Sequence, residues 1–218
     1  MNPKWLRFLA TLSLLLMLAG TTFAVESSRI RFSFGLSGTV AEYNRTDNGT
    51  KTDFTSSLTN TVSASGLDLY YVFDNGLGIG LGTGSVTYSN EAVLESNLDE
   101  TAIGGSTLDL SYTLGEDINL TLGVGIVGSA TLTSLKEDGV EYSGLYDTTT
   151  KRSNSYFVNI GFALGENWEL LLGQRTWDIA LKATNTSDTT DVKEYDAKFS
   201  VGYLGFGYRF KPPSGGGQ

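Results

Sequence analysis

The 218-residue chain has no cysteine and no histidine, and its three prolines lie near its two ends, at Pro3, Pro212 and Pro213. The lack of cysteine excludes disulfides and thiol nucleophiles. The lack of histidine removes the side chain that most often serves as a general base. Proline cannot donate to a sheet ladder, so its absence from the middle of the chain allows a fold made mostly of paired strands.

Positive charge is also scarce, because 15 Lys and Arg residues stand against 24 Asp and Glu residues, a formal charge of −9. This balance argues against nucleic acid as a partner. Beyond the first residues, no segment has the unbroken apolar run of a membrane-spanning helix. A helical membrane protein is therefore excluded. A transmembrane β-barrel is not, because its strands are apolar on one face only.

Residues 1–24 have the pattern of a cleaved secretory signal peptide. Lys4 and Arg7 form a basic start, an apolar run covers residues 9–18, and a small-residue cleavage site ends at Ala24. The run is too short for a membrane anchor, since a spanning helix needs about 20 residues. We therefore expect an exported protein. Its fold is predicted over residues 25–210, followed by a flexible tail over residues 211–218.

Apolar and polar residues alternate along most of residues 25–210, which predicts β-strands. A unit of strand, tight turn and strand starts at Leu67 and recurs at Leu108 and Val158. Its turns contain Gly, Asn and Asp, which tolerate the positive φ of short hairpins, near residues 74–76, 115–117 and 165–167. Long polar segments alternate with these turns, at about residues 44–60, 89–101, 134–153 and 183–194. This order predicts an all-β fold, an antiparallel up-and-down barrel of about eight strands.

The composition of the two strand faces indicates that the apolar face meets lipid. The polar face carries mostly Gly, Ser and Thr, whereas a water-facing sheet carries more Lys and Glu. Aromatic residues on the apolar face cluster beside the short turns and again near the long loops, as at two membrane interfaces. A soluble barrel with its apolar face inside is the alternative. We expect a transmembrane barrel with short periplasmic turns and long extracellular loops.

Two strands change their alternation along their length. Apolar residues fall at even positions from Trp168 to Leu172 and at odd positions from Trp177 to Leu181. A similar change follows Tyr203. A β-bulge in each strand would restore the face. Alternatively, the upper parts of these strands rise above the membrane.

The last predicted strand ends with aromatic residues at alternate positions, Phe206, Tyr208 and Phe210. This pattern resembles the closing strand of the small eight-stranded outer-membrane barrels of the OmpA and OmpX type. The resemblance implies that these three residues form the signal read by the barrel-assembly machinery. It also implies location in the outer membrane of a Gram-negative bacterium, in contact with its lipid and lipopolysaccharide. Residues 211–218 depart from the pattern, because many members of the family stop at the terminal Phe.

The lumen of so narrow a barrel is filled by side chains, so charges inside it must pair. The alternation predicts these inward charges: Arg31, Asp68, Asp109, Glu169, Arg175 and Arg209. We expect Glu169 to pair with Arg209, with Arg31 close by, and Arg175 to pair with Asp109. Such pairs either plug the lumen or, as the resemblance to the OmpA barrel implies, gate it. Inward glycines such as those at positions 78–84 favour residual space.

Catalysis, cofactors and bound metals are not expected. The known acyltransferases, deacylases, phospholipases and proteases among outer-membrane barrels rely on histidine, which this chain lacks. Two long loops are acidic, and a weak cation site is an alternative there, but their spacing matches no calcium-loop motif. Their acidic residues are Glu91, Glu95, Asp99, Glu100, Asp188, Asp191 and Glu194.

Two functions from different classes remain. The first is a non-enzymatic barrel with a structural or surface-interaction role, which acts through its extracellular loops on an unidentified partner. The second is a narrow gated channel for small solutes or ions.

Overall fold

The computed structural model describes residues 27–55, 60–90, 99–137 and 139–210. The predicted signal peptide and tail, as well as Glu91 and Glu95, lie outside these residues. Within them, no helix is long and apolar enough to cross a membrane.

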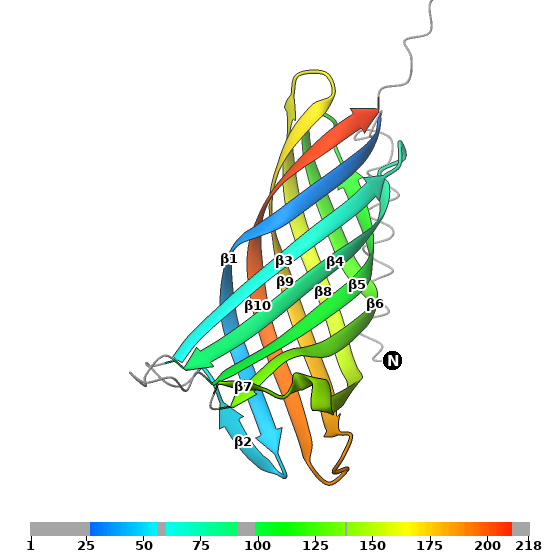
Figure 1. Ribbon diagram of the computed structural model, residues 1–218. Helices are drawn as coiled ribbons and strands as arrows, with labels where there is room; N and C mark the ends of the chain where they lie inside the picture. Colours follow the sequence, from blue (N-terminus) through cyan, green and yellow to red (C-terminus); the bar gives the residue numbers. More distant parts are fainter. Residues whose placement is uncertain (1–26, 56–59, 91–98, 138, 211–218) are drawn as a thin grey trace, which may run out of the picture.

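Eight long antiparallel strands form a closed ring (Figure 1). These are β1 (Ser28–Asp47), β3 (Asn60–Val72), β4 (Leu77–Asn90), β5 (Glu100–Leu114), β6 (Ile118–Glu137), β8 (Tyr146–Leu164), β9 (Trp168–Asn185) and β10 (Val192–Phe210). The loops at one end hold β2 (Thr50–Asp53), β7 (Val140–Glu141) and the 3-10 turn η1 (Ser143–Leu145). The first strand pairs with the last from Ser28↔Phe210 to Asp47↔Lys193, which closes the barrel. The predicted fold class is confirmed.

Glycine forms each of the three short turns. Gly76, Gly115 and Gly165 have φ angles of 83°, 87° and 71°, a conformation that L side chains rarely adopt. In the first turn the side chain of Asn75 also accepts a hydrogen bond from the backbone N–H of Leu77, at 3.0 Å. The turns therefore lie where the sequence predicted them, at the end of the barrel that also holds the start of β1 and the end of β10 (Figure 1).

The long loops are shorter than predicted, because strand pairing continues through much of the polar segments. The β8–β9 ladder starts at Tyr146↔Asn185, and the β9–β10 ladder starts at Thr184↔Val192. Only residues 186–191 remain as the fourth loop. These segments contain many Ser, Thr and Asp residues because their outward faces are polar, and their composition therefore resembles that of loops.

The interior changes from polar to apolar along the barrel axis. In β9 the odd-numbered residues face inward throughout, and among them Glu169, Arg175, Trp177 and Leu181 are buried. The β9–β10 register runs without a shift, so the bulges predicted in these two strands are wrong. The apolar residues change parity because they face outward in the lower part of each strand and inward in the upper part. This agrees with the alternative interpretation, in which the upper parts of the strands rise above the membrane. The register shifts that do occur place the extra residues in β1, β6 and β8.

An apolar core fills the end of the barrel away from the short turns. Its largest members include Trp177, which is fully buried, and Phe199, whose ring stacks on that of Trp177 at 6.2 Å. Tyr43 of β1, Tyr195 of β10 and Ile103 of β5 also belong to this core. We call this part of the barrel the outer half, and the part next to the short turns the membrane half.

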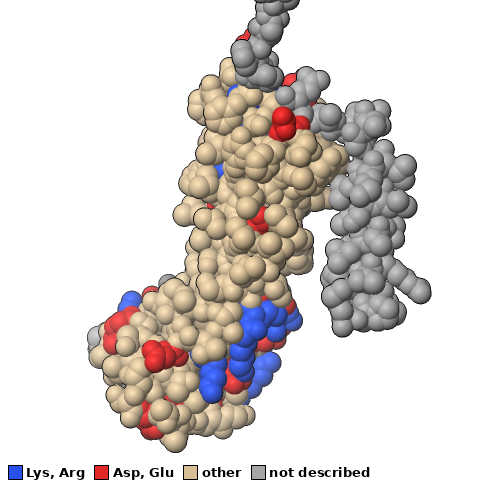
Figure 2. Space-filling model, turned by 90° about the vertical axis from the view of Figure 1, so that its right-hand side faces the viewer, with Lys and Arg blue, Asp and Glu red and all other residues tan. Residues whose placement is uncertain are grey.

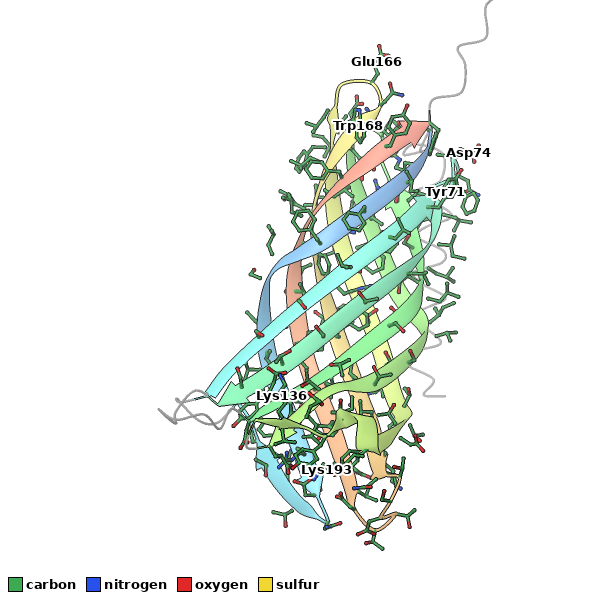
Figure 3. All side chains as sticks on the ribbon, viewed as in Figure 1. Tyr71, Asp74, Lys136, Glu166, Trp168 and Lys193 are labelled. Atoms are coloured by element: carbon green, nitrogen blue, oxygen red, sulfur yellow. The ribbon has the colours of Figure 1, made fainter. Side chains whose placement is uncertain are left out.

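An apolar belt covers the outside of the membrane half and ends abruptly. Its last rows of paired outward residues are Leu69–Leu81–Leu108–Val127 on β3 to β6 and Ile160–Leu172–Leu204–Phe34 on β8, β9, β10 and β1. Aromatic residues such as Tyr71 and Trp168 stand at its turn end, and Lys136 and Lys193 lie at the opposite end of the molecule (Figure 3). This apolar band with an aromatic rim is the surface that a bilayer covers.

Beyond the belt, the outward face of the outer half becomes polar. On β8, β9, β10 and β1 it carries a charged row, Asn154–Asp178–Lys198–Glu42. Arg152 of β8 bridges Asp178 of β9 at 2.8 Å and Asp196 of β10 at 2.9 Å. Figure 2 shows Lys and Arg side chains gathered in one run on this part of the molecule. The outer half is therefore built like a water-soluble protein, with its apolar side chains inside.

The wall of the outer half divides into two four-stranded sheets. The β1–β3 ladder ends at Phe34↔Leu67, and the β6–β8 ladder ends at Gly125↔Ser155. Farther out, β3 to β6 cross over β8, β9, β10 and β1 at an angle (Figure 1), with the apolar core between them. The barrel thus continues as a β-sandwich, in which two sheets bury one core.

The two tryptophans of residues 25–210 provide a test of this facing. Trp168 is 55% exposed on the belt, whereas Trp177 is 0% exposed. In vesicles of brominated lipid, the Trp177→Phe variant, which keeps Trp168, should lose most of its fluorescence, and the Trp168→Phe variant should lose little. Equal quenching of the two variants would contradict the inward position of Trp177.

Candidate functional site

The first layer of luminal charge lies near the short turns. The buried Glu169 carboxylate of β9 accepts hydrogen bonds from Nε of Arg31 at 2.6 Å and from Nη1 of Arg29 at 3.0 Å. The Arg31 guanidinium also donates to Asn119 at 2.7 Å and to Thr121 at 2.6 Å. A buried charge is tolerated only when it is paired and hydrogen-bonded, and this layer meets both conditions.

Arg209 lies at the periplasmic mouth of this layer and does not pair with Glu169, so that prediction is wrong. Its guanidinium lies 3.4 Å from a Glu116 carboxylate oxygen and donates to the Gly165 carbonyl at 2.7 Å. Arg29, which the sequence analysis does not include among the inward charges, pairs with Glu169 in place of Arg209. It also bridges Glu116 at 2.6 Å. The alternation that placed Arg31 inside, extended back by two residues, would have placed Arg29 there too.

The second layer lies deeper in the barrel and centres on Arg175. Its guanidinium donates to Asp68 at 2.7 Å and, through its other terminal nitrogen, to Asp109. Asp109 also accepts a hydrogen bond from the hydroxyl of Thr107 at 2.7 Å. The three charged side chains are at most 1% exposed. The sequence therefore identified all three members, and the structure brings them together.

Aromatic rings cover the Arg175 guanidinium. Its Cζ lies 4.7 Å from the ring centre of Phe157 and 4.9 Å from that of Trp177. Cation–π contacts of this kind hold a desolvated guanidinium in place. Trp177 belongs to the apolar core, so Arg175 stands at the boundary between the polar and apolar parts of the lumen.

The two layers balance each other in charge. The first holds Arg29, Arg31 and Arg209 against Glu116 and Glu169, and the second holds Arg175 against Asp68 and Asp109. The four arginines thus face four carboxylates. The exposed Asp117 adds a further contact to Arg209 at 3.6 Å. Apart from the exposed Asp117, the two layers together carry no net formal charge, so they do not form a site of one sign that would attract ions.

The acidic residues in and beside the fourth loop bond to neighbouring side chains. Asp191 accepts hydrogen bonds from the Tyr146 hydroxyl at 2.5 Å and from Asn185 at 3.1 Å, and the Tyr146 bond lowers the pKa of its carboxyl. Glu194 pairs with Lys151 at 2.6 Å. Among the described residues, no group of three or more His, Cys, Asp or Glu side chains could hold a metal ion.

A pocket of about 390 Å³ opens at the extracellular end of the barrel. The stacked rings of Phe54 and Tyr88, 4.2 Å apart, line it together with Arg45, Lys136 and Asp99. Sites that bind small molecules commonly combine aromatic walls with a few polar or charged groups that orient the ligand. Sequence reasoning assigned this region only to solvated loops and therefore missed the pocket.

The three residues of the predicted assembly signal point outward from β10 beside the short turns. Phe206 and Phe210 are each 46% exposed, and the Tyr208 ring packs edge-on against Trp168 at 5.2 Å. They thus form part of the aromatic rim of the belt.

No family model and no curated protein matches this chain. Among solved structures, outer membrane protein OprG from Pseudomonas aeruginosa is 16% identical, with a TM-score of 0.51, and the match covers 87% of this chain and 98% of that one. Neisserial surface protein A is 12% identical (84% and 97% covered), and the outer membrane protease OmpT from Escherichia coli is 10% identical (87% and 98% covered), each with a TM-score of 0.39. The match to OprG, together with the belt, shows that the chain has the fold of a small outer-membrane β-barrel.

Gly82 of β4 provides the space that Arg175 occupies. A Cβ at this position would lie 1.3 Å from Nη1 of Arg175. The guanidinium of Arg175 is held between two aromatic rings and two carboxylates, so it has little room to move aside. We therefore expect Gly82→Ala to break the second layer and to lower the free energy of unfolding by about 3–5 kcal/mol, as for a broken buried ion pair. Urea titration of the refolded protein in vesicles measures it.

Gly104→Ala is the matched control, because its Cβ would face outward with its nearest neighbour, Cγ2 of Thr133, at 3.3 Å. The control should unfold close to the wild type. Equal stability of the two variants would mean that Arg175 can leave its carboxylates at little cost.

Proposed function

We propose that this protein is a non-enzymatic outer-membrane barrel that acts through its extracellular surface, with a lumen that does not conduct. The observation that carries this proposal is that side chains fill the lumen at successive levels. Two layers of ion pairs occupy the membrane half, and the apolar core occupies the outer half.

The apolar core is a stronger barrier to water and ions than the two layers of ion pairs. A gate made of ion pairs can open when its charges exchange partners, but water and ions must still cross the region around Trp177, Phe199 and Ile103. An apolar constriction excludes water and thereby stops ions. For Arg175 to open a path by moving outward, its charge would have to enter this core, whose described members include no carboxylate to offset its desolvation.

The described carboxylates of the lumen do not have the arrangement that general-base catalysis requires. Glu169 and Asp109 are held by arginines and by further hydrogen bonds, which leaves neither positioned as a general base towards a substrate. Because these carboxylates are buried, a substrate could reach them only by displacing the plug.

The outer half is suited to recognition. Extended strand pairing and a packed core support its surface, and binding sites are most precise on rigid supports. The pocket beside Phe54 and Tyr88 is the site where we expect a small polar ligand or a charged group of a partner to bind. During biogenesis, we expect Phe206, Tyr208 and Phe210 to be read by the barrel-assembly machinery, after which the belt contacts lipid and lipopolysaccharide.

Single-channel recording of the refolded protein in planar bilayers tests the closed lumen. Wild type should give no discrete openings. Asp109→Ala and Arg175→Ala should also be silent, because the apolar core remains in place. Folding of each sample is checked by its shift on SDS gels after heating. Openings in wild type that change in either variant would favour the gated channel instead.

A further inference from the structure

The outside of β3 to β6 changes from apolar to hydroxyl-bearing within two rows of residues. The row Leu69–Leu81–Leu108–Val127 is followed by Leu67–Thr83–Ser106–Ser129 and then by Ser65–Ser85–Gly104–Thr131. The first row ends the lipid-facing belt. The hydroxyl rows therefore lie at the level where the polar groups of the outer leaflet begin.

Three depressions follow one another across this change in polarity. A depression of about 350 Å³ in the belt shares Leu81 and Leu108 with one of about 400 Å³ at its edge. The second shares Thr83, Ser106 and Ser129 with a third of about 630 Å³. Together they form a continuous groove, apolar at one end and lined by hydroxyls at the other.

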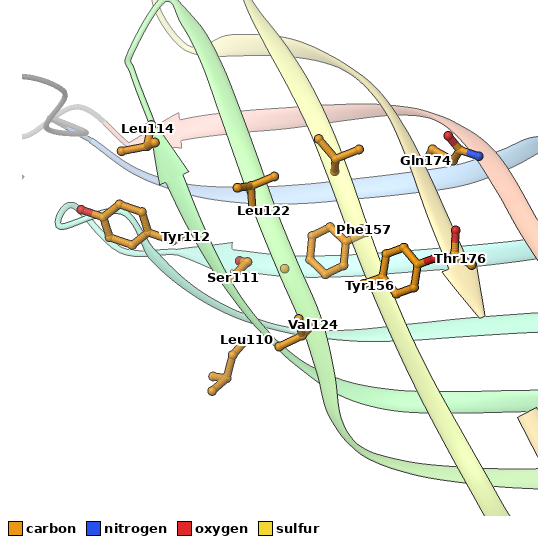
Figure 4. Close-up of a pocket in the computed structure, with 12 residues that line it drawn as sticks. Leu110, Ser111, Tyr112, Leu114, Leu122, Val124, Tyr156, Phe157, Gln174 and Thr176 are labelled. Carbon is orange, nitrogen blue, oxygen red and sulfur yellow. The ribbon is translucent and has the colours of Figure 1, made fainter. Parts of the chain in front are cut away.

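The parting of β1 from β3 shapes the polar end of the groove. Phe34 and Gly35 line that end, at the point where the β1–β3 ladder stops. Across the groove the outward side chains are small, such as Ser85, Ser106 and Thr131, so the surface lies low. By contrast, a depression of about 460 Å³ on β5, β6, β8 and β9 has mainly apolar walls, among them Leu110, Leu122 and Tyr156 (Figure 4).

The groove contains no charged side chain among its lining residues. On the outward side of β3 to β6, the described charges beyond the belt begin only with Glu100 and Lys136, which pair at 3.3 Å. A phosphate group would require basic side chains or free backbone N–H groups. The lining instead suits a neutral group with many hydroxyls.

Hydroxyl pairs inside the groove can bind such a group. The Ser106 and Ser129 hydroxyls are 2.7 Å apart, and those of Ser65 and Ser85 are 2.9 Å apart. In each pair one hydroxyl donates to the other, which leaves one O–H and several lone pairs for a ligand. A sugar ring offers donors and acceptors at matching spacing.

We propose that this groove binds a glycolipid of the outer leaflet, with an acyl chain on Leu81, Leu108 and Val127 and an uncharged part of its saccharide on Thr83, Ser106 and Ser129. The site deepens the proposed surface role and rests on its outer-membrane placement, but not on the closed lumen. Conductance would therefore refute the earlier proposal and leave this one intact.

Native mass spectrometry of the refolded protein in detergent tests the site. The probes are an acylated diglucosamine without phosphates, a phosphatidylethanolamine with the same acyl chains, and free diglucosamine. The double variant Ser106→Ala/Ser129→Ala should bind the acylated diglucosamine about tenfold more weakly, as expected for the loss of one or two hydrogen bonds. Its binding of phosphatidylethanolamine should not change, because the apolar end is untouched.

The matched control is Thr176→Val/Ser200→Ala, which removes another outward hydroxyl pair, 2.9 Å apart, from β9 and β10. It should bind both lipids as wild type does. The site would be refuted by equal losses in the two double variants, or by equal affinity of wild type for the two lipids. Free diglucosamine binding as tightly as its acylated form would refute the role of the apolar end.

Discussion

Each β-strand of this barrel has only two faces, but its surroundings change from lipid to water along the barrel axis. The side that the apolar residues face must therefore change along the strand, and the rest of the structure depends on this change. Where lipid lies outside, apolar residues must face outward and the lumen receives the polar ones. Where water lies outside, the same strands must turn their apolar residues inward. The parity change at Trp177 is the point in β9 where this exchange occurs.

The constraint also explains why the lumen contains two kinds of filling. Polar residues enclosed in the membrane half cannot reach water, so arginines and carboxylates pair in layers there. Apolar residues enclosed in the outer half form an ordinary core. Arg175 stands between the two fillings, with carboxylates on one side and aromatic rings on the other. A guanidinium suits this boundary because its edge donates hydrogen bonds while its face packs on rings.

Strand number, turn positions and the lipid-facing side could be predicted because they depend on local signals. Turn glycines predict the short hairpins, and apolar residues with a period of two predict the strands and their faces. Both signals lie within a few neighbouring residues of the sequence. The bulge interpretation of β9 and β10 assumes one constant environment for the whole strand and is wrong, whereas its alternative, in which the upper parts of these strands leave the membrane, agrees with the unshifted register. Composition alone does not separate Ser- and Thr-rich strands from loops, because the outward polar face of a strand has the composition of a loop.

The charged site was predictable in part for a similar reason. Alternation places Asp68, Asp109 and Arg175 inside, and repeated spacing places the two aspartates at one depth, so their meeting could be expected. The partner of Glu169 depends instead on the stagger between β1 and β9, two strands separated by β10 in the barrel. No local pattern reports that stagger. Arg29 rather than Arg209 fills the position as a result.

The glycines of β4 show that side-chain volume decides whether the lumen contains free space, which the alternation of residues alone does not. Read alone, inward glycines suggested residual space in the lumen. In the structure, a Cβ at Gly80 would lie 2.2 Å from Tyr70, one at Gly82 would meet Arg175, and one at Gly84 would lie 2.5 Å from Trp177. Each glycine thus makes room for a large side chain from another strand, two of which come from β9 across the barrel. In a lumen this narrow, small residues on one wall indicate large residues on the facing wall, and only their combined volume distinguishes a pore from a plug.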